Sequence, residues 1–374
     1  MKKIELYIHI PFCKQKCGYC DFLSFPRGEE IQSQYVEALL AEIKKVEPLL
    51  EYEVSSVFFG GGTPSILKAE YLTEILDTLR DRFHFDGNAE ISLEANPGTV
   101  DEEKLKAYRK AGFNRISFGC QATEDELLKK LGRIHTYDQF LKEYEAARKA
   151  GFQNINVDLM SALPGQTLKQ WVDALKKIAH LGAEHISAYS LILEEGTSFY
   201  EKQDELQLPG EEEERRMYEA TFEVLGQFGY EQYEISNYAK PGFACRHNVG
   251  YWIRTDYLGL GLGAASLLDN KRFSNTDNLE IYLKHSQNPD EIRENVEMLD
   301  TKDCQEEFLM LGLRMMRGVS EKEFEEKFGH TLDEIYGDVI DKYVKMGMLV
   351  RADGRMFFSR KGISVSNVIL ADFL

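Results

Sequence analysis

In the N-terminal part of the chain, short runs of apolar residues alternate with longer segments in which apolar and polar residues are mixed. Runs rich in β-branched and aromatic residues at Glu5–His9, Ser55–Phe59 and Glu90–Glu94 predict strands. Segments such as Ile31–Val46 and Lys68–Arg82 repeat their apolar residues at helical spacing and predict amphipathic helices. Strands that alternate with helices in this way predict a parallel sheet covered by helices.

One phrase recurs in the chain and marks where helices end. Each copy has a polar helical segment, then Gly, then a short β-rich run: RKAGFNRISFG (109–119), RKAGFQNINVDL (148–159), AHLGAEHISAYSL (179–191) and GQFGYEQYEIS (226–236). Glycine at this place is typical of a helix C-terminus that closes in the left-handed conformation. The phrase therefore predicts a series of helix-to-strand connections.

The predicted fold class is α/β, with a full or partial TIM-type (β/α) barrel of six or seven strand–helix units before about Tyr238. An open, doubly wound sheet is the alternative. In barrels the active site lies at the carboxyl ends of the strands. Chemically distinctive residues follow the predicted strands and should share one rim, namely a cysteine-rich loop, GGGTP (60–64), Glu94 with NPG (96–98), Gln121 and Asp158.

The pattern changes after Tyr238, and the chain is expected to divide into a barrel (1–238), a linking segment (239–300) and a C-terminal domain (301–374). Helices dominate from Thr301 onward, and Asp353-Gly354 predicts a hairpin turn. Helices followed by a hairpin predict a smaller, α-rich, winged-helix-like domain. Because the chain is acidic, we expect this domain to pack against the barrel or contact protein rather than DNA.

Composition narrows the possible functions of this 374-residue chain, of which 43% is hydrophobic and 29% charged. A net charge of −18 argues against a nucleic-acid-binding protein. The N-terminus MKKIELYIHIPF lacks the features of a signal peptide, and no apolar run is long enough to span a membrane. We therefore expect a cytoplasmic protein, in which clustered cysteines bind metal or do chemistry rather than form disulfides.

Three of the six cysteines, Cys13, Cys17 and Cys20, lie in one short loop with the spacing C-x3-C-x2-C. Thiolates in a short loop are typical iron–sulfur ligands. Three of them would leave one iron of a four-iron cluster without a protein ligand, and that iron could bind a small molecule. The alternative is a set of free or zinc-bound thiols in an interaction module.

The cysteine motif, with Tyr19 before its last cysteine, resembles the signature of radical S-adenosylmethionine (SAM) enzymes. This resemblance implies a [4Fe-4S] cluster on the three cysteines and SAM bound to it. It also implies which residues contact SAM: Tyr7, Tyr19, Gly61, Gly62, Thr63, Glu94, Gln121, Arg133 and Asp158. Cys120, beside Gln121, is expected to be a small buried residue.

The segments YIHIPFC, GGGTP, SFGCQ, LPGQT and YEISNYA together resemble the oxygen-independent coproporphyrinogen III oxidase family over nearly the whole chain. One branch of that family oxidatively decarboxylates coproporphyrinogen. The other branch, the HemW-type heme chaperones, binds heme and delivers it to heme-requiring respiratory proteins. The resemblance leaves both activities open until features specific to one branch are found.

Three features favour the chaperone branch. The dehydrogenases carry a further cysteine at the position of Phe22, and they have a long extension before the first strand, which here starts near Met1. CRHNVGYW also matches the H-N-x-x-Y-W motif of the chaperones, with His247, Asn248, Tyr251 and Trp252. An imidazole is a good axial ligand of heme iron, so His247 is expected to bind heme.

The resemblance thus implies a heme chaperone that carries a [4Fe-4S] cluster and SAM, without coproporphyrinogen dehydrogenase activity. Its expected partners are heme and heme-accepting respiratory proteins, with peripheral contact to the membrane and a homodimer. Nucleic acid is not an expected partner. The alternative is an oxygen-independent coproporphyrinogen III dehydrogenase with the same cofactors.

Overall fold

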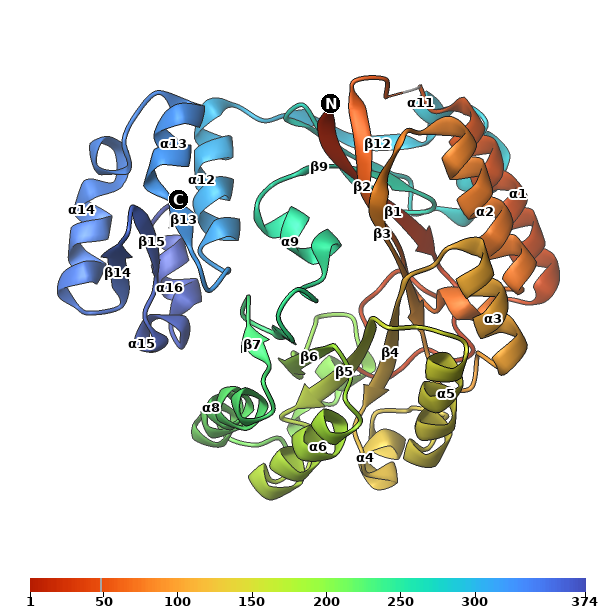
Figure 1. Ribbon diagram of the computed structural model, residues 1–374, viewed down its shortest axis with the longest axis horizontal. Coiled ribbons are helices and arrows are strands. Elements are labelled where there is room, and N and C mark those ends of the chain that lie inside the picture. The colour runs from red at the N-terminus through yellow and green to blue at the C-terminus, as the bar shows by residue number, and fades with distance from the viewer. Residues whose placement is uncertain (48) are drawn as a thin grey trace.

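The computed structural model describes residues 1–47 and 49–374, and a large twelve-stranded sheet forms its body beside a small three-stranded sheet. The centre of the large sheet is a run of parallel strands in chain order, as the alternation of strands and helices predicts (Figure 1). These strands are β1 (Lys2–Ile10), β2 (Tyr52–Gly61), β3 (Phe85–Ala95), β4 (Arg115–Gln121), β5 (Ile155–Ser161) and β6 (His185–Ser190). Their side chains are mostly buried on both faces, which is typical of a parallel sheet.

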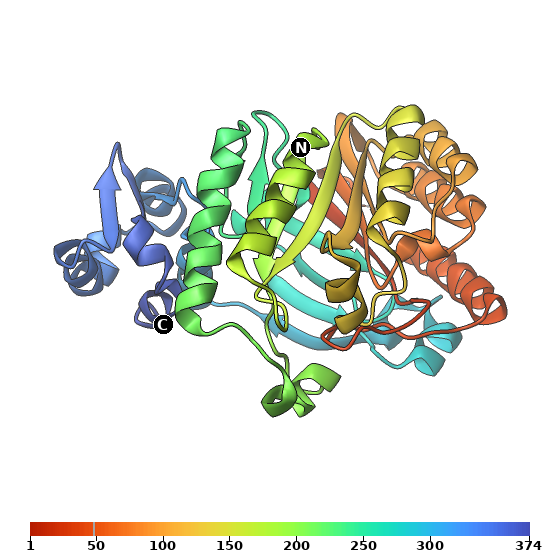
Figure 2. The same cartoon turned by 90° about the horizontal axis from the view of Figure 1, so that it is seen from below.

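The connecting helices range along the outer, convex side of the curved sheet (Figures 1 and 2). They are α1 (Glu29–Lys45), α2 (Ala69–Arg82), α3 (Glu102–Ala111), α4 (Asp125–Lys130), α5 (Tyr137–Lys149), α6 (Leu168–His180) and α8 (Glu211–Gln227). Short turns of helix, η1 (Pro64–Ile66), α7 (Ser198–Glu201) and η2 (Gln203–Glu205), lie in the loops. The glycines of the recurring phrase follow α3, α5, α6 and α8 with φ of 104°, 95°, 76° and 79°, so the predicted left-handed helix ends are confirmed.

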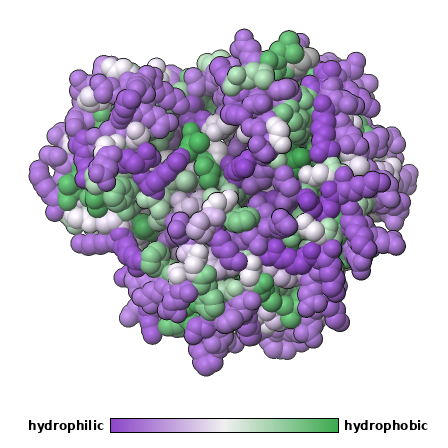
Figure 3. All heavy atoms as spheres, viewed as in Figure 1, coloured by the Kyte–Doolittle hydropathy of each residue, from purple (hydrophilic) through white to green (hydrophobic). Residues whose placement is uncertain are grey.

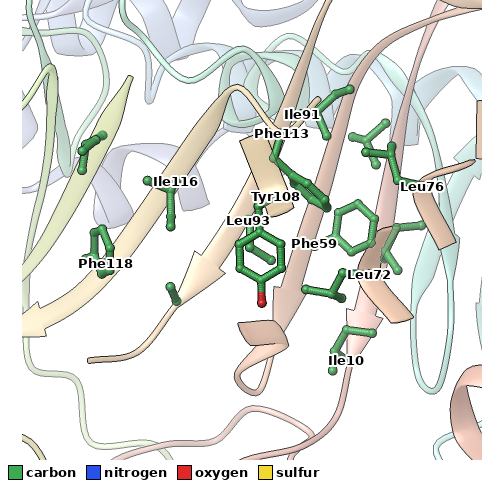
Figure 4. Packing of buried hydrophobic residues seen from close by; sticks show 14 of the residues in the cluster. Ile10, Phe59, Leu72, Leu76, Ile91, Leu93, Tyr108, Phe113, Ile116 and Phe118 are labelled. Carbon is green, nitrogen blue, oxygen red and sulfur yellow. The ribbon is translucent and has the colours of Figure 1, made fainter. Parts of the chain in front are cut away.

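Aromatic side chains fill the layer between the sheet and its outer helices (Figure 4). The ring of Phe113 lies 5.0 Å from that of Phe59 and 5.7 Å from that of Tyr108, measured between centroids. Leu72 and Leu76 of α2 close this layer over the strands, and all of these side chains are fully buried. Since burying one such side chain contributes about 1.5–3 kcal/mol, this layer holds the helices on the sheet.

The parallel pattern stops after β6. The last copy of the recurring phrase leads only into β7 (Glu231–Gln232), which pairs antiparallel with β8 (Asn237–Ala239), and β8 pairs antiparallel with β6. The sheet therefore does not close, and the predicted partial barrel is confirmed. A doubly wound sheet carries its connecting helices on both faces. Here the connecting helices lie on the outer face of the sheet, so the doubly wound alternative does not apply (Figure 1).

Residues 239–300, predicted as a linking segment, add four strands to the large sheet. They contribute β9 (Asp256–Leu260), β10 (Ala265–Leu268), β11 (Lys271–Asn275) and β12 (Arg293–Met298), with α9 (Arg246–Trp252), α10 (Leu279–His285) and α11 (Pro289–Ile292) between them. β9 pairs in parallel with β1, so these strands extend the sheet beyond its first strand. We therefore propose that residues 1–300 form one unit.

The C-terminal residues form a separate cluster around their own apolar core, which includes Leu309, Phe324, Ile340 and Met356. Its elements are α12 (Thr301–Gly312), β13 (Val319–Ser320), α13 (Glu321–Phe328), α14 (Leu332–Lys345), β14 (Leu349–Ala352), β15 (Arg355–Phe358), α15 (Arg360–Ile363) and α16 (Ser366–Ala371). β14 and β15 form the hairpin predicted at Asp353-Gly354, and β13 completes the small sheet. The smaller C-terminal domain with a small antiparallel sheet is thus present.

A buried arginine joins the two units. The Arg254 side chain, in the turn between α9 and β9, is 4% exposed and donates to the Glu307 carboxylate of α12 at 2.7 Å. It also donates to Asn270 at 2.9 Å and contacts the Cys304 sulfur at 3.3 Å. Arg272 makes a second ion pair with Glu307. This ion cluster fastens the C-terminal unit to the sheet.

In the described parts of the chain, no helix is long and apolar enough to cross a membrane. The face shown in Figure 3 is mostly hydrophilic, with apolar side chains scattered among the polar ones.

Replacing Arg254 by methionine should loosen the C-terminal unit. We expect Arg254→Met to lower the free energy of unfolding by roughly 3 kcal/mol, because it leaves a part-buried carboxylate with one partner fewer. Urea unfolding measures this effect, and faster proteolysis near residue 300 should accompany it. The matched control is Arg351→Met, which removes two more exposed ion pairs within the C-terminal unit, with Glu321 and Asp333, and should cost less than about 1 kcal/mol. An equal loss of unfolding free energy in both variants would contradict this role of Arg254.

Candidate functional site

The three cysteines of the sequence motif lie in the loop that follows β1. A backbone hydrogen bond from Cys13 to Phe25 (3.3 Å) closes the base of the loop, and one from Cys20 to Cys17 (3.2 Å) makes a turn inside it. The thiols of all three are free and partly exposed. They open into one cavity of about 500 Å³ at the carboxyl ends of the strands. The loop therefore presents its thiols together on the predicted rim.

The glycine turn after β2 is fastened to the backbone of the cysteine loop. The amide of Gly62 donates to Ile10 at 2.9 Å, and the amide of Thr63 donates to Phe12 at 2.8 Å. A Cβ on Gly62 would lie 2.7 Å from the Phe12 carbonyl oxygen, so a larger residue cannot make this approach. The Thr63 hydroxyl also contacts the Cys13 sulfur at 3.4 Å. The glycines thus allow two loops to meet at hydrogen-bonding distance.

A single arginine ties the far side of the cavity to the cysteines. Arg133 contacts the Cys17 sulfur at 3.6 Å and donates to the Asn96 side chain at 2.6 Å and to the Gly119 carbonyl at 2.5 Å. The guanidinium thus places a positive charge beside one of the proposed iron ligands. Burial raises the pKa of the neighbouring Cys20 thiol, so a cluster there would have to displace its proton.

Two half-buried carboxyl groups face the same cavity. Burial, and then the charge of Asp158, raise the pKa of Glu94 to about 8, although the Gly61 amide stabilises its ionised form. Burial also raises the pKa of Asp158, against hydrogen bonds from Ser117 (3.2 Å) and Asn156 (2.7 Å). A cationic ligand would favour the ionised form of both groups.

The cavity gathers most of the residues predicted to contact SAM. Its lining includes Tyr19, Gly61, Gly62, Thr63, Glu94, Gln121, Arg133 and Asp158 as well as the three cysteines. Tyr7 does not line it. That side chain is half-buried on β1 beside the ring of His247, and its hydroxyl lies 3.0 Å from Nδ1 of His9. Whether the lining residues contact SAM stays a prediction.

The sequence interpretation missed other polar residues of this cavity. Ser117, Ser187, Tyr189 and Asn237 also line it, and the Tyr189 hydroxyl donates to Gln121 at 2.9 Å. The missed signal is the period of two on the strands. Ser117, Gly119 and Gln121 alternate on β4, and Ser187 and Tyr189 alternate on β6, so each set shares one face.

The H-N-x-x-Y-W segment, which is expected to bind heme through His247, is a short helix. It forms α9, which lies on the concave side of the sheet (Figure 1). His247 is only 1% exposed, and its ring stacks on Phe58 at 5.0 Å between centroids. Nδ1 lies 2.8 Å from the Ser56 hydroxyl, and Nε2 lies 3.2 Å from the Tyr251 hydroxyl. Both nitrogens are engaged, so a heme iron does not fit this imidazole while α9 stays in place.

Burial lowers the pKa of His247 to about 3, so the ring is neutral at physiological pH. The Glu90 carboxylate receives the backbone amide of Arg246 at 3.1 Å and thereby holds the start of α9. Asn248 is half-buried, and Trp252 at the helix end lies against the C-terminal unit beside Met315. The motif as a whole packs α9 between the sheet and that unit. Heme ligation by His247 stays a prediction.

No group of three His, Cys, Asp or Glu side chains within residues 1–47 and 49–374 converges on the position of a single metal ion. A single zinc ion needs such convergence. The thiolates of a multi-iron cluster bind different irons and need only surround it. Three thiols on one loop, with polar groups across a cavity, therefore suit an iron–sulfur cluster with a small-molecule ligand better than zinc.

Comparison with known proteins agrees with this chemistry. Residues 7–178 match the model of the radical SAM superfamily, and residues 299–365 match that of the HemN C-terminal domain. The fold is shared with coproporphyrinogen III oxidase (HemN) of Escherichia coli, a radical SAM enzyme, at a TM-score of 0.86 and 24% identity over 100% of this chain and 90% of that one.

Two curated relatives cover almost the whole chain. The heme chaperone HemW of Lactococcus lactis is 37% identical over 100% of this chain and 98% of its own length. The heme chaperone HemW of Bacillus subtilis is 36% identical over 98% of each chain. The radical SAM domain implies a [4Fe-4S] cluster and SAM as cofactors. The chain belongs to the HemW family of radical SAM proteins, as the resemblance in its sequence predicts.

Proposed function

We propose that this protein is a heme chaperone, which binds heme and transfers it to heme-requiring acceptor proteins. Its full-length likeness to the HemW heme chaperones supports this function. The observation that carries the choice over a dehydrogenase is Phe22. Its side chain is 60% exposed at the cavity, at the position where the dehydrogenase branch has a further cysteine.

In this proposal Cys13, Cys17 and Cys20 hold a [4Fe-4S] cluster at the mouth of the cavity. When bound, the cluster and SAM supply one-electron chemistry. The protein's own part is to hold both cofactors in place. Arg133 keeps positive charge at the Cys17 sulfur, and the turn at Gly62 keeps the second loop against the first.

SAM would occupy the rest of the cavity, with its charged amine near the two carboxyl groups. The pair formed by Glu94 and Asp158 is costly to ionise without a cation, which supports a cationic ligand there. Gly61, Thr63 and Gln121 supply backbone and side-chain groups on the same wall. Tyr7 would act indirectly, by positioning the strand beneath the cavity.

The partners follow from the same function. We propose heme and heme-accepting respiratory proteins, which implies peripheral contact with a membrane and a cytoplasmic location, and a homodimer as the working form. Because His247 is enclosed, ligation of heme by the α9 motif would require α9 to leave the sheet.

Heme titration and transfer test the function directly. We expect the full chain, reconstituted with its cluster, to bind hemin to saturation and to pass it to an apo-hemoprotein acceptor. An anaerobic assay with reductant, SAM and coproporphyrinogen should give no stoichiometric protoporphyrinogen. Absence of a saturable hemin complex would refute the chaperone, and stoichiometric protoporphyrinogen would establish the dehydrogenase instead.

Removing one thiol of the loop should remove the cluster. We expect Cys17→Ala to lose most of its iron and acid-labile sulfide after anaerobic reconstitution, because three thiolates are the only protein ligands proposed. The matched control is Cys120→Ala, since Cys120 is fully buried beside the same rim. Iron retained in Cys17→Ala, or lost equally in the control, would contradict the ligand assignment.

The half-buried Glu94 should make the free energy of unfolding depend on pH. Its pKa is about 8 in the folded protein against an ordinary value of 4.5, so the folded state binds more protons between these values. Stability is therefore highest below pH 4.5 for this group and falls as the pH rises towards 8. Urea unfolding without cofactors measures this effect. Between pH 4.5 and 8, the free energy of unfolding of Glu94→Gln should fall by roughly 2–4 kcal/mol less than that of the wild type. The exposed Glu70→Gln should decline like wild type, and an unchanged decline in Glu94→Gln would exclude a raised pKa.

A further inference from the structure

A tight turn of residues 96–99 follows β3 at the rim of the cysteine cavity. The amide of Thr99 donates to the carbonyl oxygen of Asn96 at 3.1 Å, and the Thr99 hydroxyl donates to the same oxygen at 2.6 Å. Gly98 has a φ of 91°, a left-handed conformation that favours glycine. The turn therefore fixes the backbone of Asn96, whose side chain lines the cavity.

Two neighbouring segments hold this turn in place. The amide of Gly98 donates to the Glu143 carboxylate of α5, at 2.8 and 3.0 Å from its two oxygens. The ammonium group of Lys14, which follows Cys13 in the chain, donates to the carbonyl oxygen of Gly98 at 2.5 Å. The turn thus joins an outer helix to the cysteine loop.

The side chain of Asn96 makes one hydrogen bond with each of two residues that reach the cysteines. Its oxygen Oδ1 accepts from the Arg133 guanidinium at 2.6 Å, and its nitrogen Nδ2 donates to the Thr63 hydroxyl at 2.7 Å. A guanidinium can only donate hydrogen bonds, so the atom of Asn96 that faces Arg133 must be the oxygen. The orientation of the amide is therefore set by its neighbours.

The direction of these bonds decides where the Thr63 proton lies. Because the Thr63 oxygen accepts from Asn96, its own proton is free to point at the Cys13 sulfur, 3.4 Å away. A thiolate bound to iron carries no proton, so between these two groups only the hydroxyl can then donate. The chain of hydrogen bonds runs in one direction, from Arg133 through Asn96 and Thr63 to Cys13.

The same arginine reaches a second cysteine directly, because its guanidinium lies 3.6 Å from the Cys17 sulfur. In the part of the chain that the structure describes, no carboxylate lies within ion-pair distance of Arg133. Its positive charge therefore acts on two sulfurs, on Cys17 by contact and on Cys13 through the two side chains between them.

Donors aimed at these sulfurs stabilise negative charge. Hydrogen bonds to the sulfurs are one of the means by which a protein sets the reduction potential of an iron–sulfur cluster. Reduction adds one negative charge, so by Coulomb's law such donors stabilise the reduced form more than the oxidised form. Losing a donor should therefore lower the potential.

We propose that Asn96 is a positioning residue for the cluster, which passes the polarity of the Arg133 charge through Thr63 to Cys13 and so raises the reduction potential. This inference rests on the cluster proposed for the three cysteines. It gives the turn after β3 a function in setting the redox chemistry of the cavity, beyond its place in the wall.

The midpoint potential of the full, reconstituted chain, measured without SAM, tests this role. Asn96→Asp keeps the shape of the side chain and the acceptor for Arg133, but a carboxylate cannot donate to Thr63, so the Thr63 hydroxyl turns away from Cys13. We expect the reduction equilibrium to move about tenfold towards the oxidised cluster, a fall of about 59 mV for a one-electron couple. Iron and acid-labile sulfide should stay at the wild-type level.

A second variant and a control separate the hydrogen bond from added charge and from folding. Thr63→Val removes the donor to Cys13 without adding a charge, and should move the equilibrium about threefold in the same direction. The control is Asn114→Asp. Asn114 also uses both ends of its amide, accepting from Ile91 and donating to Ala89 at 2.8 Å each, but it lies before β4, at the amino-terminal ends of the strands. Its potential should equal that of the wild type.

The outcomes separate this role from the cluster on which it rests. An unchanged potential in both Asn96→Asp and Thr63→Val would overturn the role, and so would an equal fall in Asn114→Asp. If Asn96→Asp loses its iron, the potential of Thr63→Val decides: a fall supports the role and an unchanged value overturns it. A wild-type chain without iron and sulfide after reconstitution would instead refute the cluster on the three cysteines, and this role with it.

Discussion

The pairing of β1 with β2 is the constraint on which the site depends. Their parallel register pairs Ile10 with Gly61, so the loops that follow the two strands start side by side at the same edge of the sheet. Two backbone hydrogen bonds then join the glycine turn to the cysteine loop, and Gly62 leaves no space between them. A substitution at Gly62 would therefore act on the cysteines through the backbone, although its own side chain carries no chemistry.

Beneath the cavity, the concave side of the sheet is polar rather than apolar. Its amino-terminal half carries buried polar residues on successive strands: Glu5, Ser56, Glu90, Arg115 and Asn156. Burial raises the pKa of Glu5 to about 9, so this carboxyl is neutral at physiological pH. Such groups are costly to bury unless a partner satisfies them. Helix α9 is the partner of two of them, because it brings the amide of Arg246 to Glu90 and the ring of His247 to Ser56.

The sequence predicted the repeating part of the fold and most of the candidate site. Strand and helix periodicity is local, and residues at the ends of neighbouring parallel strands must share a rim, so Cys17, Glu94 and Asp158 could be brought together in advance. The place of residues 239–300 could not be predicted in this way. β9 pairs with β1 across about 250 residues, and nothing in local periodicity encodes that choice. The burial of His247 could not be predicted for the same reason, since the residues that it contacts lie on strands distant in the sequence.

The enclosed position of α9 gives its motif a role that needs no ligand. His247 stacks on Tyr7 at 6.4 Å between centroids, and the Tyr7 hydroxyl meets Nδ1 of His9 at 3.0 Å. Nε2 of His9 lies 2.9 Å from the carbonyl oxygen of Leu23, which can only accept, so Nε2 carries the proton and Nδ1 accepts from Tyr7. Leu23 is in the loop that carries the cysteines. Contacts therefore run without a break from α9 to the cysteine loop, so the helix can set the position of the thiols from the opposite half of the strands.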